Sequence, residues 1–253
     1  MSDIKTYLDE EGFVESGKEE VKRVLAQYPE INQEFERMRR GESTKDFYDF
    51  MSQMVGGISL YDFLKSRSRS LVEWRVREIS KYVNGGGKIV DAGCGMGLEA
   101  VFFAQLAEEG GITGVDSSEA MLNLARKRAE KRGLENLRFL NADMESLPIE
   151  GSSQDLVYCI ESLYDNRPKG EIFSRGNDEM GRLHEFRRVL RMGGKLIFTL
   201  TSKTEDSCNR AAECYEEILD CLDYGNFSRT KGYHTVADGA SANHMLVIAE
   251  AVR

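Results

Sequence analysis

The strongest constraint on the fold is an alternation of strand-like and helix-like segments that begins at Lys88. Short β-branched or apolar runs occupy residues 88–93, 112–116, 137–143, 154–162 and 194–202. Helical patterns occupy residues 97–109 and 118–133, and two more are marked by Leu183, Phe186 and Leu190 and by Ala211, Cys214, Tyr215, Ile218 and Leu222. This alternation predicts an α/β fold with a doubly wound, mostly parallel sheet and helices on both faces.

The first 83 residues have a different pattern. Apolar residues recur there at helical spacing among charged neighbours, first at Val21, Val24, Leu25 and Tyr28, and then at Phe47, Phe50, Met51 and Met54. A further helix is expected over residues 59–83, because three glycines follow it. A chain of 253 residues can form one large α/β domain with a cap. We therefore predict an N-terminal helical cap over residues 1–83 and a core over 84–253, with simple helix packing or a homodimer surface as the alternative use of these apolar groups.

Three acidic residues close successive strands of the predicted sheet: Asp91, Asp116 and Asp143. Ligands of such sheets bind outside the carboxyl ends of the strands, where the strand order reverses. A carboxylate about 20 residues past a glycine turn is the usual partner of vicinal ribose hydroxyls, and Asp116 has this position. Asp143 suits a donor such as an exocyclic amine on a base. The three residues together predict a nucleoside site.

The turn in "KIVDAGCGMG", residues 88–97, restricts the kind of nucleoside. A nicotinamide dinucleotide needs G-x-G-x-x-G, but Leu98 stands where the last glycine of that spacing belongs. The Lys-Ser/Thr pair of a phosphate-binding loop is also missing. Asp91 and Glu99 flank the turn and would repel a phosphate. The turn therefore favours a nucleoside that carries an ammonium group and a cationic centre.

Four segments in this order, "VDAGCGMG", "GVDSSEAMLNLAR", "NADMESLP" and "FRRVLRMGGKLIFT", resemble the successive motifs of class I S-adenosylmethionine-dependent methyltransferases. The resemblance spans roughly residues 88–202, with closing strands expected around 232–238 and 244–252. It implies a Rossmann-like methyltransferase fold, a seven-stranded sheet whose last strand runs antiparallel, and S-adenosylmethionine as the cofactor. The match departs at Met192, which stands where a proline often precedes the paired glycines.

The resemblance also implies roles for single residues. The three glycines of the turn would approach the methionine part of the cofactor, Asp116 would accept both ribose hydroxyls, and Asp143 with Met144 would frame the adenine. The cofactor-binding residues expected on this basis are Asp91, Gly93, Gly95, Gly97, Asp116, Ser117, Met121, Asp143, Met144 and Glu161.

The substrate side is marked by "CIESLYDN", which closes the fourth strand. In small-molecule methyltransferases of the quinone and natural-product type, which this segment resembles, it often reads E-S-x-x-H. Here Glu161 and Ser162 are kept, while Tyr164 and Asp165 replace the histidine region. We expect Tyr164 to orient a substrate, Asp165 to attract or deprotonate an amine or hydroxyl, and His234 to reach the pocket from the sheet edge. A surface turn at 164–165 and a surface position for His234 are the alternatives.

The predicted function is transfer of a methyl group from S-adenosylmethionine to an O, N or C nucleophile of a small-molecule acceptor, mainly by proximity and alignment. Three alternatives stay open: a cofactor-binding module without turnover, a protein or nucleic-acid methyltransferase, and a nicotinamide dehydrogenase. A net charge of −9 and a pI near 5.1 argue against a nucleic-acid acceptor. The sequence does not identify the acceptor.

Composition restricts the setting of the protein. The five cysteines are odd in number and have no C-x-x-C spacing, and no His/Asp/Glu group has the spacing of metal ligands. We therefore expect neither a disulfide framework nor a metal. The sequence has no apolar run of roughly 20 residues and no signal peptide, so we expect a cytoplasmic protein without a membrane span.

Overall fold

The computed structural model describes residues 3–13, 18–31, 33, 37, 44–55, 58–60, 62, 69–83, 87–107, 110–163, 177–202, 204–235 and 241–252. Within these residues, no helix is both long and apolar enough to cross a bilayer.

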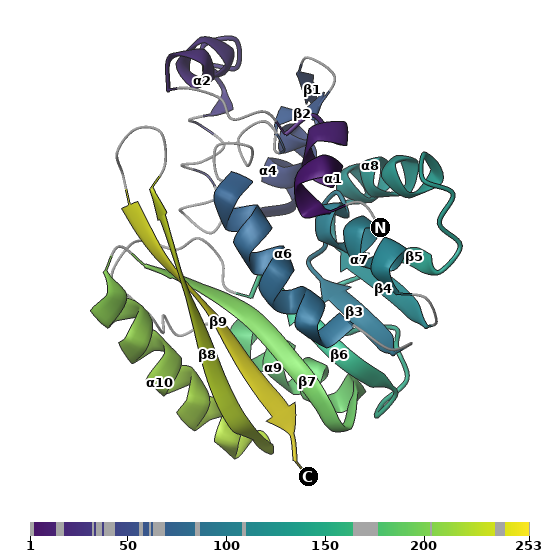
Figure 1. Ribbon diagram of the computed structural model, residues 1–253, viewed down its shortest axis with the longest axis vertical. Coiled ribbons are helices and arrows are strands. Elements are labelled where there is room, and N and C mark those ends of the chain that lie inside the picture. Colours follow the sequence, from purple (N-terminus) through teal and green to yellow (C-terminus); the bar gives the residue numbers. More distant parts are fainter. Residues whose placement is uncertain are drawn as a thin grey trace.

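A seven-stranded sheet forms the centre of the molecule (Figure 1). Its strands are β3 (Lys88–Ala92), β4 (Gly111–Asp116), β5 (Leu137–Asn141), β6 (Gln154–Cys159), β7 (Leu190–Ser202), β8 (Tyr224–Thr235) and β9 (Ser241–Ala251). Their order is β5-β4-β3-β6-β7-β9-β8. Strands β3 to β7 pair in parallel, and β9 runs antiparallel to both β7 and β8. The doubly wound, mostly parallel sheet with an antiparallel last strand is confirmed.

Helices cover both faces of this sheet (Figure 1). One face carries α9 (Asn177–Val189) and α10 (Glu205–Cys221), and the other carries α1 (Ile4–Glu10), α6 (Arg69–Val83), α7 (Leu98–Leu106) and α8 (Glu119–Glu130). Along β3, Val90 faces the first group of helices and Ile89 the second. Because both faces are buried, the central strands read as continuous apolar runs, and this is why the sequence predicted them.

Three expected boundaries were wrong. Ser59, expected to open a helix over 59–83, belongs to β2 (Ile58–Ser59), which pairs antiparallel with β1 (Met54–Val55), whereas Leu60, Asp62 and α6 (Arg69–Val83) are helical as expected. Leu190, expected in a helix, opens β7, where it pairs with Gln154 of β6. Strand β8 begins at Tyr224 and not near residue 232. At Ser59 and Leu190, strand pairing decides the local structure against the helical spacing, and β8 is longer than expected.

Helix α1 was not anticipated, and it packs on the side of the sheet that α6 and α7 cover. The Tyr7 hydroxyl donates to the carbonyl of Leu98 at 2.8 Å, and the Tyr7 ring lies 5.2 Å from that of Phe102. Arg69 at the start of α6 donates to the carbonyl oxygens of Lys5 and Phe13. The described helices α1 and α6 are therefore part of the layer that covers the sheet.

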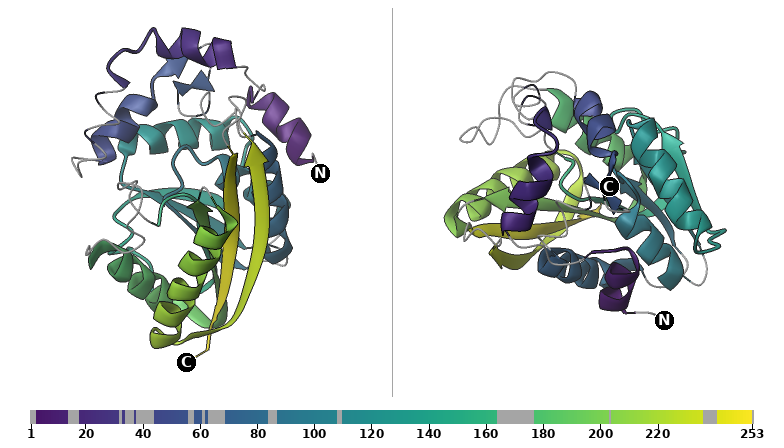
Figure 2. Two further views of the ribbon diagram at one scale, coloured as in Figure 1. Left: turned by 90° about the vertical axis from the view of Figure 1, so that its left-hand side faces the viewer. Right: turned by 90° about the horizontal axis from the view of Figure 1, so that it is seen from above.

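The remaining N-terminal elements lie above the carboxyl ends of the parallel strands (Figures 1 and 2). They are α2 (Lys18–Leu25), α4 (Thr44–Met51), β1 and β2. Their buried apolar side chains form one cluster with two residues of the core, and its members are Val24, Ile31, Phe47, Met51, Leu60, Met96 and Met121. Met96 follows β3 and Met121 lies in the first turn of α8, so this cluster covers the strand ends where a ligand of such a sheet binds.

Candidate functional site

The glycine turn after β3 has a backbone that ordinary residues rarely adopt. Gly93, Gly95 and Gly97 have φ angles of +75°, +52° and +68°. A Cβ atom on Gly93 would lie 2.4 Å from Cβ of Ser162, and one on Gly97 would lie 3.0 Å from the ring of Phe139. A Cβ on Gly95 would meet no atom within 4 Å. Gly93 and Gly97 therefore allow close packing inside the protein, whereas Gly95 faces open space.

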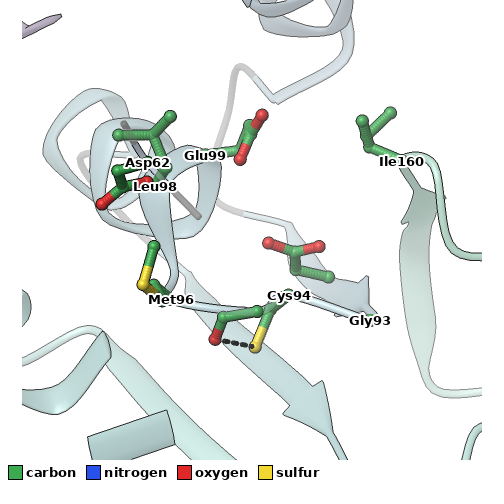
Figure 3. Close-up of a pocket in the computed structure, with 9 residues that line it drawn as sticks. Asp62, Gly93, Cys94, Met96, Leu98, Glu99 and Ile160 are labelled. Carbon is green, nitrogen blue, oxygen red and sulfur yellow. Dashed lines mark hydrogen bonds between the residues drawn. The ribbon is translucent and has the colours of Figure 1, made fainter. Parts of the chain in front are cut away.

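A pocket lies beside this turn, between the carboxyl ends of β3 and β6, where the strand order reverses. Figure 3 shows Met96, Leu98 and Glu99 on one side of it and Ile160 across from them. Its lining residues are Asp62, Asp91, Gly93, Cys94, Gly95, Met96, Leu98, Glu99 and Ile160. Three of these described residues are acidic and none is basic, although Glu99 pairs with Arg75 and Asp62 with Arg128, which offset part of this negative charge.

Cys94 also lines the pocket, and its thiol is not a nucleophile. Burial raises the pKa of Cys94 well above the usual value, and the carboxylates of Asp91 and Asp116 raise this pKa further. Because the thiolate is the reactive form of cysteine, Cys94 stays an inert thiol at neutral pH.

Asp116 at the end of β4 holds the turn from one side. Its Oδ2 accepts the backbone N–H of Gly95 at 2.8 Å, and its Oδ1 accepts that of Ser118 at 2.9 Å. Burial raises the pKa of this carboxyl, the two N–H groups oppose the rise, and nearby Asp49 adds to it. Since a carboxylate oxygen can accept more than one hydrogen bond, Asp116 can fix the turn and still receive a hydroxyl of a ligand.

Ser118 connects this strand end to the N-terminal elements. It caps α8, where its Oγ accepts the backbone N–H of Met121 at 3.2 Å. The same hydroxyl donates to the carboxylate of Asp49 in α4. Helix α4 is thus tied to the turn that carries Asp116.

A buried ion-pair cluster lies behind the pocket. The guanidinium of Arg75 in α6 pairs with Glu99 and, at 3.3 Å, with Oε1 of Glu161, and the side chain of Arg75 is only 2 % exposed. Glu161 has a φ of +57°, and its backbone N–H donates to the hydroxyl of Thr199 at 2.7 Å. A positive φ at a non-glycine residue is costly and persists only where the surroundings hold it. The cluster therefore fixes the chain at the end of β6.

No role was expected for Arg75 from the sequence, although its position in the helix is unusual for a charged residue. Its position belongs to the apolar stripe of α6, whose other buried members are Leu71, Val72, Val76, Ile79 and Val83. A charged residue within such a stripe has to find a buried partner. Asp62, Asp49 and Ser118 had no comparable signal.

The other expected cofactor residues differ in their surroundings. Asp91 lines the pocket and is buried, and the sulfur of Met144 would lie 3.5 Å from a Cβ atom on Gly93. Met121 is buried in the apolar cluster beneath α4. Ser117 and Asp143 are exposed, and the carboxylate of Asp143 accepts the N–H of Glu145 at 2.9 Å. The cofactor roles of all these residues stay predictions.

Of the three expected catalytic residues, the structure describes only the backbone of His234. Tyr164 and Asp165 lie outside the described residues. His234 belongs to β8, which β7 and β9 separate from β6, so its backbone is roughly 14 Å from β6 at the usual strand spacing. A catalytic role for any of them stays a prediction. Among the residues that the structure describes, no group of three or more His, Cys, Asp or Glu residues could hold a metal ion.

Known proteins resemble this chain mainly in the part that contains the sheet. A family model described as "Methyltransferase domain" matches residues 84–241, more than half of the chain. A ubiquinone biosynthesis O-methyltransferase of Acinetobacter baylyi is 28% identical over 163 residues, which are 63% of this chain and 62% of that protein. The U6 snRNA (guanine-N(2))-methyltransferase THUMPD2 of Mus musculus is 28% identical over 147 residues, 58% of this chain and 26% of that protein. The match therefore spans less than two thirds of either relative.

Among solved structures, the 4+2 cyclase SpnF superposes with a TM-score of 0.59 at 19% identity, covering 73% of this chain and 83% of that one. At this identity the likeness concerns the fold alone.

Proposed function

The chain belongs to the methyltransferase domain family, and from this premise we propose that it transfers a methyl group from S-adenosylmethionine to an O, N or C nucleophile of a small-molecule acceptor. The observation that carries the proposal is the acid-lined pocket at the point where the strand order reverses, beside an open glycine and next to Asp116.

The residues around the turn fit this cofactor. Asp62, Asp91 and Glu99 line a pocket that would receive an ammonium and a sulfonium group, with Arg128 and Arg75 offsetting part of the charge of Asp62 and Glu99. Gly95 leaves room for close approach, and Asp116 would accept the ribose hydroxyls. We assign Met144, beside Gly93, and the adjacent Asp143 to the adenine. When bound, S-adenosylmethionine supplies a methyl group that its positive sulfur activates for displacement.

The contribution of the chain is mainly alignment and exclusion of water. The apolar cluster that includes side chains of α2 and α4 together with Leu60 covers the strand ends from which an acceptor would approach. Holding two reactants in line can account for a large part of the acceleration of such a transfer. A base is needed only where the acceptor has to lose a proton, and Tyr164, Asp165 and His234 remain the candidates for that step.

A small-molecule acceptor is supported by the ubiquinone biosynthesis O-methyltransferase of Acinetobacter baylyi, because the match covers 62% of that protein. The net charge of −9 points the same way, because a nucleic-acid partner favours a basic surface. An RNA acceptor is the second candidate, since the mouse relative acts on an RNA according to its name, but the match covers only 26% of that protein. A cytoplasmic location stays a prediction from the sequence, and the sequence leaves a homodimer open.

Thermal unfolding with S-adenosylmethionine, S-adenosylhomocysteine or NAD, followed by transfer of a tritiated methyl group into metabolite fractions or RNA, tests the proposal. We expect the first two ligands to raise the melting temperature, NAD to leave it unchanged, and the label to appear in a small molecule. A rise with NAD would contradict the cofactor. Label in RNA would favour the second candidate, and binding without any transfer would favour a cofactor-binding module. Mass spectrometry of a co-purified ligand would restrict the range of possible methyl acceptors most.

A further inference from the structure

Arg128 in α8 joins three segments that are far apart in the sequence. Its Nε donates to Oε2 of Glu11, its Nη1 to the carbonyl oxygen of Met96, and its Nη2 to Oδ2 of Asp62, each at 2.6 Å. Each partner has a distinct place. Glu11 caps the end of α1, Met96 lies in the glycine turn, and Asp62 lines the pocket.

These contacts are buried and charged. The side chains of Arg128, Glu11 and Asp62 are 10 %, 8 % and 4 % exposed. Burial favours the neutral form of Glu11, yet Arg128 and Arg132 hold the pKa of Glu11 below its usual value, so Glu11 is ionised at neutral pH. Removing one partner of a buried ion pair is costly, because the other charge stays buried without it. Arg128 is therefore bound firmly to all three segments.

The contact with Met96 acts directly on the turn. Asp116 holds the N–H of Gly95 on one side, and Arg128 holds the carbonyl of the next residue on the other. A planar guanidinium fixes the direction of its acceptors more tightly than an ammonium does. The orientation of the turn beside the pocket thus depends on a side chain whose other two partners belong to the N-terminal 83 residues.

We propose that Arg128 is a positioning residue that couples binding at the glycine turn to the docking of α1 and of Asp62. The proposal rests on the cofactor site proposed above. A ligand that orders the turn fixes the carbonyl of Met96 and with it the guanidinium, which then holds Glu11 and Asp62 in place. Thermodynamic coupling is reciprocal, so docking of the N-terminal segments strengthens ligand binding by the same factor.

Arg132, one turn further along α8, provides a matched control. It pairs with the same Glu11 at 2.6 Å and with Glu10 at 3.0 Å, and its guanidinium lies 4.5 Å from the centre of the Tyr7 ring. Within the described part of the chain, the contacts found for Arg132 lead to α1 and to Gln105, not to the turn or to Asp62. Its loss should therefore loosen α1 without acting on the turn.

The test compares Arg128→Met and Arg132→Met in the full chain, with S-adenosylhomocysteine as the probe. Calorimetry gives the dissociation constant, and hydrogen exchange of residues 4–13 and 95–98, with and without the probe, gives the coupling. In the native protein we expect the probe to slow exchange in both segments. In Arg128→Met the affinity should fall by about tenfold or more, within the range usual for coupled sites, and the probe should no longer protect residues 4–13.

In Arg132→Met, exchange in residues 4–13 should be faster throughout, but the probe should still slow it, and the affinity should change by less than about threefold, as for a site without coupling. Arg128→Lys keeps the positive charge but loses the planar guanidinium with its several donors. It should regain part of the affinity for the probe and part of the protection of residues 4–13. This variant also serves as the test if Arg128→Met does not fold by circular dichroism. Equal loss of affinity in the two methionine variants, or continued protection of residues 4–13 in Arg128→Met, would overturn the proposal.

If the native protein does not bind the probe, the proposed cofactor site is wrong, but the role of Arg128 is not thereby contradicted. Hydrogen exchange measured without ligand then tests whether Arg128 links the turn to α1. Arg128→Met must speed exchange in residues 4–13 and in residues 95–98, while Arg132→Met speeds it only in residues 4–13. The same pattern in both variants would refute the proposed link through Arg128.

Discussion

The turn after β3 and the segment after β6 lie on opposite sides of one pocket, yet they are held in different ways. The turn is fixed largely by its neighbour in the sheet, because the N–H groups of Gly93 and Cys94 donate to the carbonyl of Val115, and that of Gly95 donates to Asp116. Glu161 after β6 is fixed by side chains that are remote in the sequence, Arg75 and Thr199. A local motif can encode the first arrangement, whereas only the folded chain assembles the second.

The largest expected effect tests the β6 side of this comparison. Arg75→Met removes the buried positive partner of Glu99 and Glu161 and should lower the free energy of unfolding by about 3–5 kcal/mol. The exposed Arg77 in the same helix is the control, and Arg77→Met should change this free energy by less than about 0.5 kcal/mol. Urea unfolding followed by circular dichroism measures both. Equal changes in the free energy of unfolding for the two variants would mean that the ion-pair cluster of Arg75 does not stabilise the end of β6.

The next effect tests the β3 side. Asp116→Ala removes the acceptor of the Gly95 N–H, which is also the proposed acceptor of the ribose hydroxyls. Two hydrogen bonds from the ribose hydroxyls to a charged carboxylate contribute about 2–4 kcal/mol to binding. Affinity for S-adenosylhomocysteine should fall by at least tenfold, the equivalent of about 1.4 kcal/mol, in a protein that keeps its fold. A folded variant with unchanged affinity in calorimetry would show that the ribose is misplaced.

A pair of glycine variants separates packing from ligand approach. In Gly93→Ala the new methyl group would meet Ser162, so overpacking of about 1–3 kcal/mol adds to the strain of a positive φ. Gly95→Ala meets open space and should lose only about 1–2 kcal/mol from its backbone. Gly93→Ala should therefore have the lower melting temperature, and Ser162→Gly in the same chain should restore part of it. A lower melting temperature for Gly95→Ala would contradict the assignment of the open side.

The smallest effect at neutral pH is the pH dependence of binding. Burial raises the pKa of Asp116 above the 3.8 of an ordinary aspartate, so in the ligand-free protein its carboxylate takes up a proton earlier on acidification. A protonated carboxyl loses acceptor capacity, so ligand binding favours the ionised form. Affinity should be constant above this pKa and fall by up to about tenfold per pH unit below it. Calorimetry over the pH range in which the protein stays folded should show the fall, and Asp116→Asn should lack this component.

The same contrast explains how much the sequence could predict. The central strands could be predicted because each buried strand has its own apolar run, and the glycine turn and Asp116 because they stand at the ends of two such strands with a spacing of about 20 residues that is usual for nucleoside sites. Helix α1 was missed because seven residues are too few for a stable isolated helix, and contacts such as that of Tyr7 with Leu98 hold it. The roles of Arg75 and Arg128 depend on partners at least 24 residues away. Local spacing in the sequence cannot predict partners at such distances along the chain.

The N-terminal elements show a related limit. The cap over residues 1–83 and the core over 84–253 stay a prediction. Among the described residues, α1 and α6 pack on the sheet, while side chains of α2 and α4 lie over the strand ends. Deleting residues 1–57 would therefore remove α1 from the layer on the sheet together with the cover of the pocket. The covering role is better examined by single substitutions such as Phe47→Ala, whose side chain belongs to the cluster with Met96 and Met121.

The most direct test of the central claim is calorimetric titration of the native chain with S-adenosylhomocysteine and with NAD under the same conditions. The account predicts saturable binding of S-adenosylhomocysteine and no measurable heat of binding for NAD, because Asp91 and Glu99 beside the glycine turn disfavour a pyrophosphate. Tight binding of NAD, or the absence of binding by S-adenosylhomocysteine, would contradict it.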